Sequence, residues 1–75
     1  MEGVIELMQE EGIYLEYWIR KDGVKMYGDY IMCAANLKLR PRGTILETSL
    51  GTAIVCDTGG FVDENPYQVD IAVTW

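Results

Sequence analysis

Closely spaced turn signals set the strongest limit on how this chain can fold. Turn-forming dipeptides and triplets recur after residue 12, at Asp22-Gly23, Gly28-Asp29, Pro41 to Gly43, Leu50-Gly51 and Gly59-Gly60. The apolar segments between them have the length and the β-branched and aromatic content of strands. The pattern predicts an all-β fold of about six strands, preceded by a short helix at residues 2–9 whose Val4, Ile5 and Met8 share one face.

The expected strands follow directly from this division. They cover residues 13–19, 24–27, 30–35, 44–48, 52–57 and 68–75. The Asp22-Gly23 pair between the first two strands is the strongest hairpin signal in the chain. Strands this short and numerous favour a small closed or nearly closed barrel, because closure removes sheet edges that so apolar a set of strands would expose.

The length of 75 residues allows one domain, residues 1–75, with a small core. A chain of this size buries about 60–65% of its unfolded surface, so its stability is expected to be marginal. We therefore predict a homodimer formed by exchange of the N-terminal hairpin. The 49% of hydrophobic residues indicates a folded chain in spite of a net charge of −6.

Composition also excludes several kinds of partner. Six basic residues against twelve acidic ones argue against nucleic acid, which is bound mainly through cationic contacts. No run of 18 apolar residues predicts a transmembrane segment, and the acidic start, MEGVIELMQEEG, does not resemble a signal peptide. The chain has no histidine, so we expect neither a metal site nor a cofactor.

The two cysteines, Cys33 and Cys56, both lie in strand-like segments. They are interpreted as small buried hydrophobic side chains. The sequence leaves a disulfide between them open, since two cysteines do not make a disulfide framework.

Two aspartates, Asp57 and Asp70, interrupt apolar segments where a strand would favour Val or Ile. They lie thirteen positions apart, on either side of one loop, so they can converge at one end of the sheet. Two neighbouring carboxyl groups in apolar surroundings favour retention of a proton on one of them, which suits general acid catalysis. The structural alternative is an Asx-turn at Asp57 and a solvated edge position for Asp70.

Three segments, CAANLKLRPRGTIL, LGTAIVCDTGG and VDIAVTW, together resemble the 3D domain of bacterial cell-wall proteins, which is named for three aspartates. The chain is thus similar to the catalytic barrel of MltA-type lytic transglycosylases and of stationary-phase survival proteins. The resemblance is strongest over residues 28–75.

This resemblance implies a double-psi β-barrel that acts on peptidoglycan glycan strands outside the cell or in the cell wall. Asp57 matches the aspartate of the family's Asp-Thr-Gly-Gly motif, and Asp70 matches the aspartate of the final strand. We expect Asp70, flanked by Val69 and Ile71, to be desolvated and to act as general acid and base, while Asp57 stays ionised. The expected substrate-binding residues are Thr58, Gly59, Gly60 and Asn36.

The chain departs from the family pattern at two places. Asn36 stands where the family usually has its first aspartate, and the loop at residues 61–66 is longer and more acidic than usual. One alternative function is therefore a non-catalytic module that binds wall glycan or serves structural assembly. A remote alternative is an aspartic-protease-like dyad, suggested by the Asp57-Thr58-Gly59 sequence.

Overall fold

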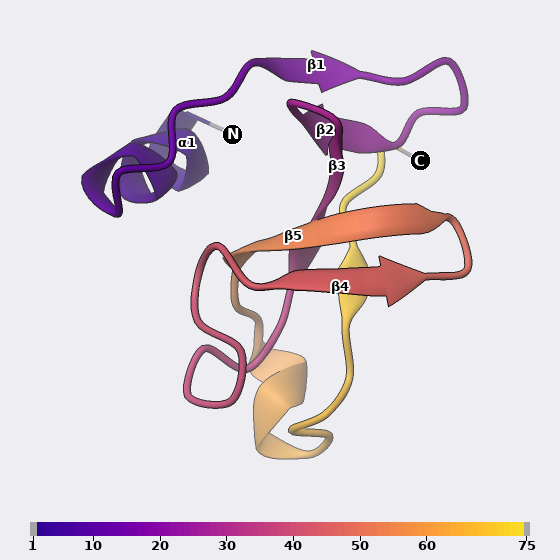
Figure 1. Ribbon diagram of the computed structural model, residues 1–75. Coiled ribbons are helices and arrows are strands. Elements are labelled where there is room, and N and C mark those ends of the chain that lie inside the picture. The colour runs from indigo at the N-terminus through magenta and orange to yellow at the C-terminus, as the bar shows by residue number, and fades with distance from the viewer. Residues whose placement is uncertain (1, 75) are drawn as a thin grey trace.

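The computed structural model of the chain describes residues 2–74, apart from the side chain of Phe61. It contains one N-terminal helix, a mixed sheet and a short 3₁₀ turn (Figure 1). The elements in chain order are α1 (Glu2–Glu10), β1 (Tyr17–Ile19), β2 (Lys25–Tyr27), β3 (Tyr30–Ala34), β4 (Ile45–Thr48), β5 (Gly51–Asp57), η1 (Gly60–Asp63) and β6 (Asp70–Ile71). The prediction of a mostly β fold with a short N-terminal helix is confirmed.

The helix forms because its apolar residues recur on one face. Met8 is fully buried, and Val4 and Ile5 pack beside it against the sheet. The helix ends at Glu10, after which the backbone N–H of Ile13 donates to the carbonyl of Met8 at 3.0 Å. This face closes one core cluster, whose buried members are Met8, Tyr27, Met32, Ile54 and Cys56.

The Asp22-Gly23 hairpin is present as predicted. β1 and β2 pair antiparallel with Trp18 opposite Met26, and Gly23 adopts a positive φ of 87° in the connecting turn. Oδ1 of Asp22 accepts the backbone N–H of Val24 at 3.2 Å, which fixes the turn from within.

β3 lies at the centre of the sheet, whose strand order is β1-β2-β3-β5-β4. β5 runs parallel to β3 along one side, and β2 pairs antiparallel with the first two residues of β3 on the other side. β6 then takes over that second side, with Cys33 opposite Ile71 and Ala34 opposite Asp70. The chain continues from β6 to meet the start of β2 through a bridge between Val24 and Val73.

A second core cluster lies apart from the one that α1 covers. It joins residues from β2, β3 and β5 and their flanks, with buried members Val24, Met26, Ile31, Cys33, Ala35, Ala53 and Val55. Gly43 allows the segment before β4 to pass close to the helix connection: its φ is 93°, and a Cβ there would lie 2.7 Å from Cδ1 of Ile13. The positive φ favours glycine at that position, and a larger residue would also require the Ile13 side chain to shift.

The sheet is not closed into a barrel. Within residues 2–74, β1 and β4 form its two ends and do not pair with each other. The first predicted strand is shortened because residue 13 serves the helix connection, where its carbonyl accepts the Tyr27 hydroxyl at 2.7 Å. The last predicted strand is reduced to Asp70–Ile71, and its predicted end at Trp75 lies outside the described residues.

Candidate functional site

Asp57 and Asp70 lie in one row with Ala34, at the end of the central strand β3. Both are register partners of Ala34: Asp57 on the β5 side and Asp70 on the β6 side. Neighbouring strands are about 4.8 Å apart, so two strand spacings place the backbones of the two aspartates about 10 Å apart. The sheet therefore places the two predicted site residues, Asp57 and Asp70, on either side of one small residue, Ala34.

A register shift makes this row possible. The pairing of β3 with β5 skips Cys56, so that Ala34 lies opposite Asp57 rather than opposite Cys56. Such a bulge adds a residue to one strand and changes the direction of the side chains that follow it.

A cavity of about 130 Å³ opens at this row and is lined by both aspartates. Its other lining residues are mostly apolar and come from α1, β3, β5 and the last segment: Val4, Met32, Cys33, Ala34, Cys56, Ile71 and Ala72. Mostly apolar residues and two acidic residues thus line the same cavity. It accommodates a small group, not a whole sugar residue.

Arg42 anchors the Asp57 side of the site. Its Nε donates to the carbonyl of Cys56 at 2.9 Å, and its Nη2 lies 3.8 Å from Oδ1 of Asp57. The Arg42 side chain is mostly buried, with 19% exposed, whereas the Asp57 side chain is 45% exposed. Asp57 therefore presents its carboxylate to solvent beside a fixed cation.

Asp70 has different surroundings. It is exposed, and its Oδ1 accepts a hydrogen bond from Nε2 of Gln68 at 2.9 Å. The desolvation expected for Asp70 is not found, because its sequence neighbours Val69 and Ile71 belong to the core cluster on the opposite face of the strand.

The segment Arg40-Pro41-Arg42 connects the two sides. While Arg42 contacts the end of β5, Nη1 of Arg40 donates to the carbonyl of Tyr67 at 3.0 Å, in the loop before β6. One short segment thus holds both strand ends that carry the aspartates. The roles of Arg40, Arg42 and Gln68 were not predicted from the sequence. A polar or charged residue in a loop cannot be told from a solvated surface residue until its hydrogen-bond partner is known.

The other predicted site residues lie around this row without converging on the cavity. Asn36 comes two residues after Ala34, and its Oδ1 accepts the backbone N–H of Lys38 at 3.0 Å in an Asx-turn. Thr58 is exposed directly after β5, and Gly59 follows it. Gly60 begins η1 without a positive φ, and a Cβ there would meet nothing within 4 Å, so its position does not require glycine.

Both cysteines are free and buried, and both line the cavity. Their thiols lie 3.4 Å and 3.5 Å from the same acceptor, the carbonyl of Ile54. Burial raises the pKa of Cys33 to about 11 and that of Cys56 to about 12, so both are protonated thiols at neutral pH. They act as packing residues, as the sequence suggested.

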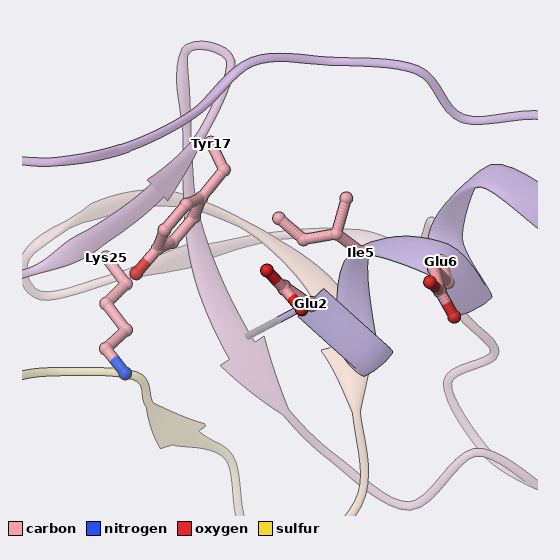
Figure 2. Close-up of a pocket in the computed structure, with 5 residues that line it drawn as sticks. All are labelled: Glu2, Ile5, Glu6, Tyr17 and Lys25. Atoms are coloured by element: carbon pink, nitrogen blue, oxygen red, sulfur yellow. The ribbon is translucent and has the colours of Figure 1, made fainter.

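A second and larger cavity of about 760 Å³ lies between α1 and the β1–β2 hairpin (Figure 2). It is lined by Glu2, Ile5, Glu6, Tyr17 and Lys25. Glu2 and Tyr17 point into the same space, next to Ile5. Neither Asp57 nor Asp70 lines this cavity, so it is separate from the row at Ala34.

Residues 2–74 contain no group of three or more Cys, Asp or Glu side chains placed to hold a metal ion. None of the helices formed by these residues has the length and apolar character needed to span a membrane.

Comparisons of the chain with protein-family models, with curated proteins and with solved structures found no match.

Proposed function

We propose that this chain acts on peptidoglycan glycan strands as a lytic-transglycosylase-like domain, at the extracellular surface or in the cell wall. The observation that carries the proposal is the shared partner of the two aspartates: Ala34 has Asp57 on one side and Asp70 on the other. The proposal also depends on the resemblance of residues 28–75 to the 3D domain. The small residue between the carboxyl groups leaves room for part of a bound glycan at the cavity mouth.

In the proposed reaction Asp70 performs both proton transfers. Its carboxyl group donates a proton to the oxygen of the bond between MurNAc and GlcNAc, and that bond breaks at C1 of MurNAc. The resulting carboxylate then accepts the proton of the MurNAc 6-hydroxyl as O6 bonds to C1, which gives a 1,6-anhydro end. No water is consumed, in contrast to glycoside hydrolysis by two carboxyl groups.

Asp57 has a supporting role in this mechanism. Its carboxylate, held beside Arg42, provides a fixed charge near the developing oxocarbenium ion. Thr58, Gly59, Gly60 and Asn36 are proposed to contact the glycan on the outer side of this row.

A double-psi β-barrel topology is part of the same proposal. A double-psi β-barrel requires neighbouring parallel strands, and the β3–β5 pair supplies one such pair. The described sheet is not closed into a barrel, since its end strands β1 and β4 do not pair with each other.

A non-catalytic module that binds wall glycan is the second candidate. The exposure of Asp70 favours it, because an exposed carboxyl group lacks the desolvation that helps to retain a proton for acid catalysis. Such a module would use the same row and the same carboxylates for hydrogen bonds to sugar hydroxyls.

Digestion of purified peptidoglycan distinguishes the two functions. Purified peptidoglycan is incubated with the wild-type chain, with Asp70→Asn and with a control, Asp63→Asn, and soluble products are identified by mass spectrometry. Asp63 is an exposed aspartate in the connection between β5 and β6. The transglycosylase proposal expects 1,6-anhydro muropeptides from the wild type and Asp63→Asn but not from Asp70→Asn.

Two other outcomes are informative. If a folded wild-type chain releases nothing yet sediments with peptidoglycan, the binding function replaces the catalytic one. If it neither releases products nor sediments, both candidates fail.

A further inference from the structure

The outer edge of β1 is an open sheet edge within the described residues. β1 pairs with β2 only, so one side of it is open, and Figure 1 shows it at the rim of the sheet. The side chains around this edge are unusually apolar for an exposed strand: Tyr14, Leu15, Trp18 and Ile19 are all exposed. An unpaired edge with exposed apolar side chains is a site where another strand adds.

The hydrogen-bond pattern shows which residues present their backbone to the open side. Arg20 N–H donates to the Val24 carbonyl at 2.8 Å, and the Glu16 carbonyl accepts from Gly28 N–H at 2.7 Å. Residues 16, 18 and 20 therefore face β2. Because backbone groups alternate along an antiparallel strand, the N–H and C=O groups of Tyr17 and Ile19 face outward.

Charge favours a second copy of this chain as the occupant of that edge. Whereas the whole chain carries a net charge of −6, residues 13–27 carry three basic and two acidic side chains, a local net charge of +1. Two copies therefore meet at this part of the surface without the strong repulsion expected between chains of net charge −6.

The order of residues along β1 matches an antiparallel copy of itself. With Trp18 at the centre of symmetry, outward-facing Tyr17 lies opposite the partner's Ile19, and Glu16 lies opposite the partner's Arg20. Opposite charges in facing positions stabilise strand pairs. Arg20 already donates from Nε and Nη2 to Asp22, at 3.0 Å and 2.7 Å, but a guanidinium has five N–H donors and retains others for Glu16.

The Trp18 side chain is fixed in position at this edge. Its Nε1 donates to the carbonyl of Gly28 at 2.8 Å, which fixes the indole on the strand surface. A positioned tryptophan at the centre of an interface loses little conformational entropy on binding. The Tyr17 side chain, on the other face, lines the cavity in Figure 2, so the partner's Ile19 would pack at the border of that cavity.

We propose that two copies of this chain associate by antiparallel pairing of their β1 edges, centred on Trp18. This mode differs from exchange of the N-terminal hairpin, because each copy keeps its own β1–β2 pairing. It is independent of the proposed glycan chemistry, since the row at Ala34 is complete within one chain.

Sedimentation equilibrium of the full chain under reducing conditions tests the association. Over about 1 μM to about 1 mM, which covers three decades of Kd, the mass should rise from 8.5 kDa toward twice that value. A mass that stays at 8.5 kDa up to about 1 mM would overturn the proposal.

A matched pair of proline variants locates the interface. Ile19 and Ile45 lie on the two end strands, with exposed fractions of 50% and 47%, and both N–H groups point away from the sheet. Ile19→Pro should weaken association at least about tenfold, while Ile45→Pro should change it less than about twofold. Equal effects of the two variants would contradict pairing at β1.

Two measurements keep the test decisive if a proline variant fails to fold. Amide hydrogen exchange of the wild type should show protection of Tyr17 and Ile19 that increases with protein concentration. Glu16→Arg should weaken association, and Glu16→Arg combined with Arg20→Glu should restore it. Absence of concentration-dependent protection would overturn the β1 interface, and absence of restoration would overturn its register.

Discussion

Ala34 lies between two unlike strands, β5 with Asp57 and β6 with Asp70, which hold the two carboxyl groups of the candidate site in different ways. On one side β5 is seven residues long and four of them are buried, and Asp57 ends this strand beside Arg42. On the other side β6 has two residues, and Asp70 is exposed and bonded to Gln68. One carboxyl group is therefore fixed by the core, whereas the other depends on a short strand and its preceding loop.

The difference suggests a division of roles. A site that must hold a charge in place benefits from the rigid side, and a site that must close on a substrate benefits from the adjustable side. The pairing of Arg40 with Tyr67 shows that the same segment reaches both sides, but with an exposed contact at β6 and a half-buried one at β5.

Matched isoleucine truncations should give the largest contrast. Ile54→Ala in β5 removes a side chain that is 3% exposed and should destabilise the chain by about 2–5 kcal/mol. Ile71→Ala in β6 removes a half-buried side chain and should have an effect of about 1 kcal/mol. Urea unfolding followed by circular dichroism measures both, and similar losses would show that the two sides are equally ordered.

Alkaline pH should act on the buried part of the sheet, because both thiols are buried there, Cys33 in β3 and Cys56 in β5. The folded pKa values of about 11 and about 12 exceed the ordinary value of 9.0, so the unfolded chain loses these protons first. Stability should be fully present below pH 9 and fall by roughly 2–3 kcal/mol by pH 10.

Replacement of Cys33 and Cys56 by alanine provides the control for this effect. Urea unfolding at pH 8 and pH 10 should show a smaller loss between the two pH values in the double variant than in the wild type. An unchanged alkaline loss would assign it to other groups.

The two arginines allow a further comparison between the sides. Arg42→Ala leaves the carbonyl of Cys56 without its donor and should cost about 1–2 kcal/mol. Arg40→Ala removes an exposed hydrogen bond to Tyr67 and should cost less than about 0.5 kcal/mol. A reversed order in thermal or urea unfolding would mean that the loop before β6, rather than the end of β5, is the anchored part.

The smallest effect is expected far from both sides, at the β1–β2 turn. The hydrogen bond from Arg20 lowers the pKa of Asp22 to about 2, so its stabilising contribution is present above pH 4 and is lost as the pH falls toward 2. Acid titration of wild type and Asp22→Asn, followed by circular dichroism, should differ slightly over this range. Identical curves would show that the pair does not contribute to folding.

Local chemistry explains what was predictable from the sequence. The Asp22-Gly23 hairpin and the face of the helix with Val4 and Met8 depend on residues close in the chain, and both are confirmed. The convergence of Asp57 and Asp70 near one another also followed from their positions on either side of one loop.

Non-local pairing explains what was not predictable. The sequence does not reveal that β3 lies between the two aspartates. Along one side, β3 pairs first with β2 and then with β6, and such long-range pairing is not encoded in any local pattern. Barrel closure was expected from strand number, yet closure depends on long-range contacts between the first and last strands. Asp70 was expected to be desolvated by Val69 and Ile71, but in a strand these neighbours point to the opposite face.

A nuclear magnetic resonance titration of ¹⁵N-labelled chain with soluble glycan fragments released from peptidoglycan tests most directly whether the row at Ala34 binds glycan. We predict saturable shifts concentrated at the amides of Ala34, Asp57 and Asp70, whether or not the fragments are cleaved. Shifts confined to another surface, or none from a folded chain at fragment concentrations of several millimolar, about the weakest Kd that such a titration detects, would contradict it.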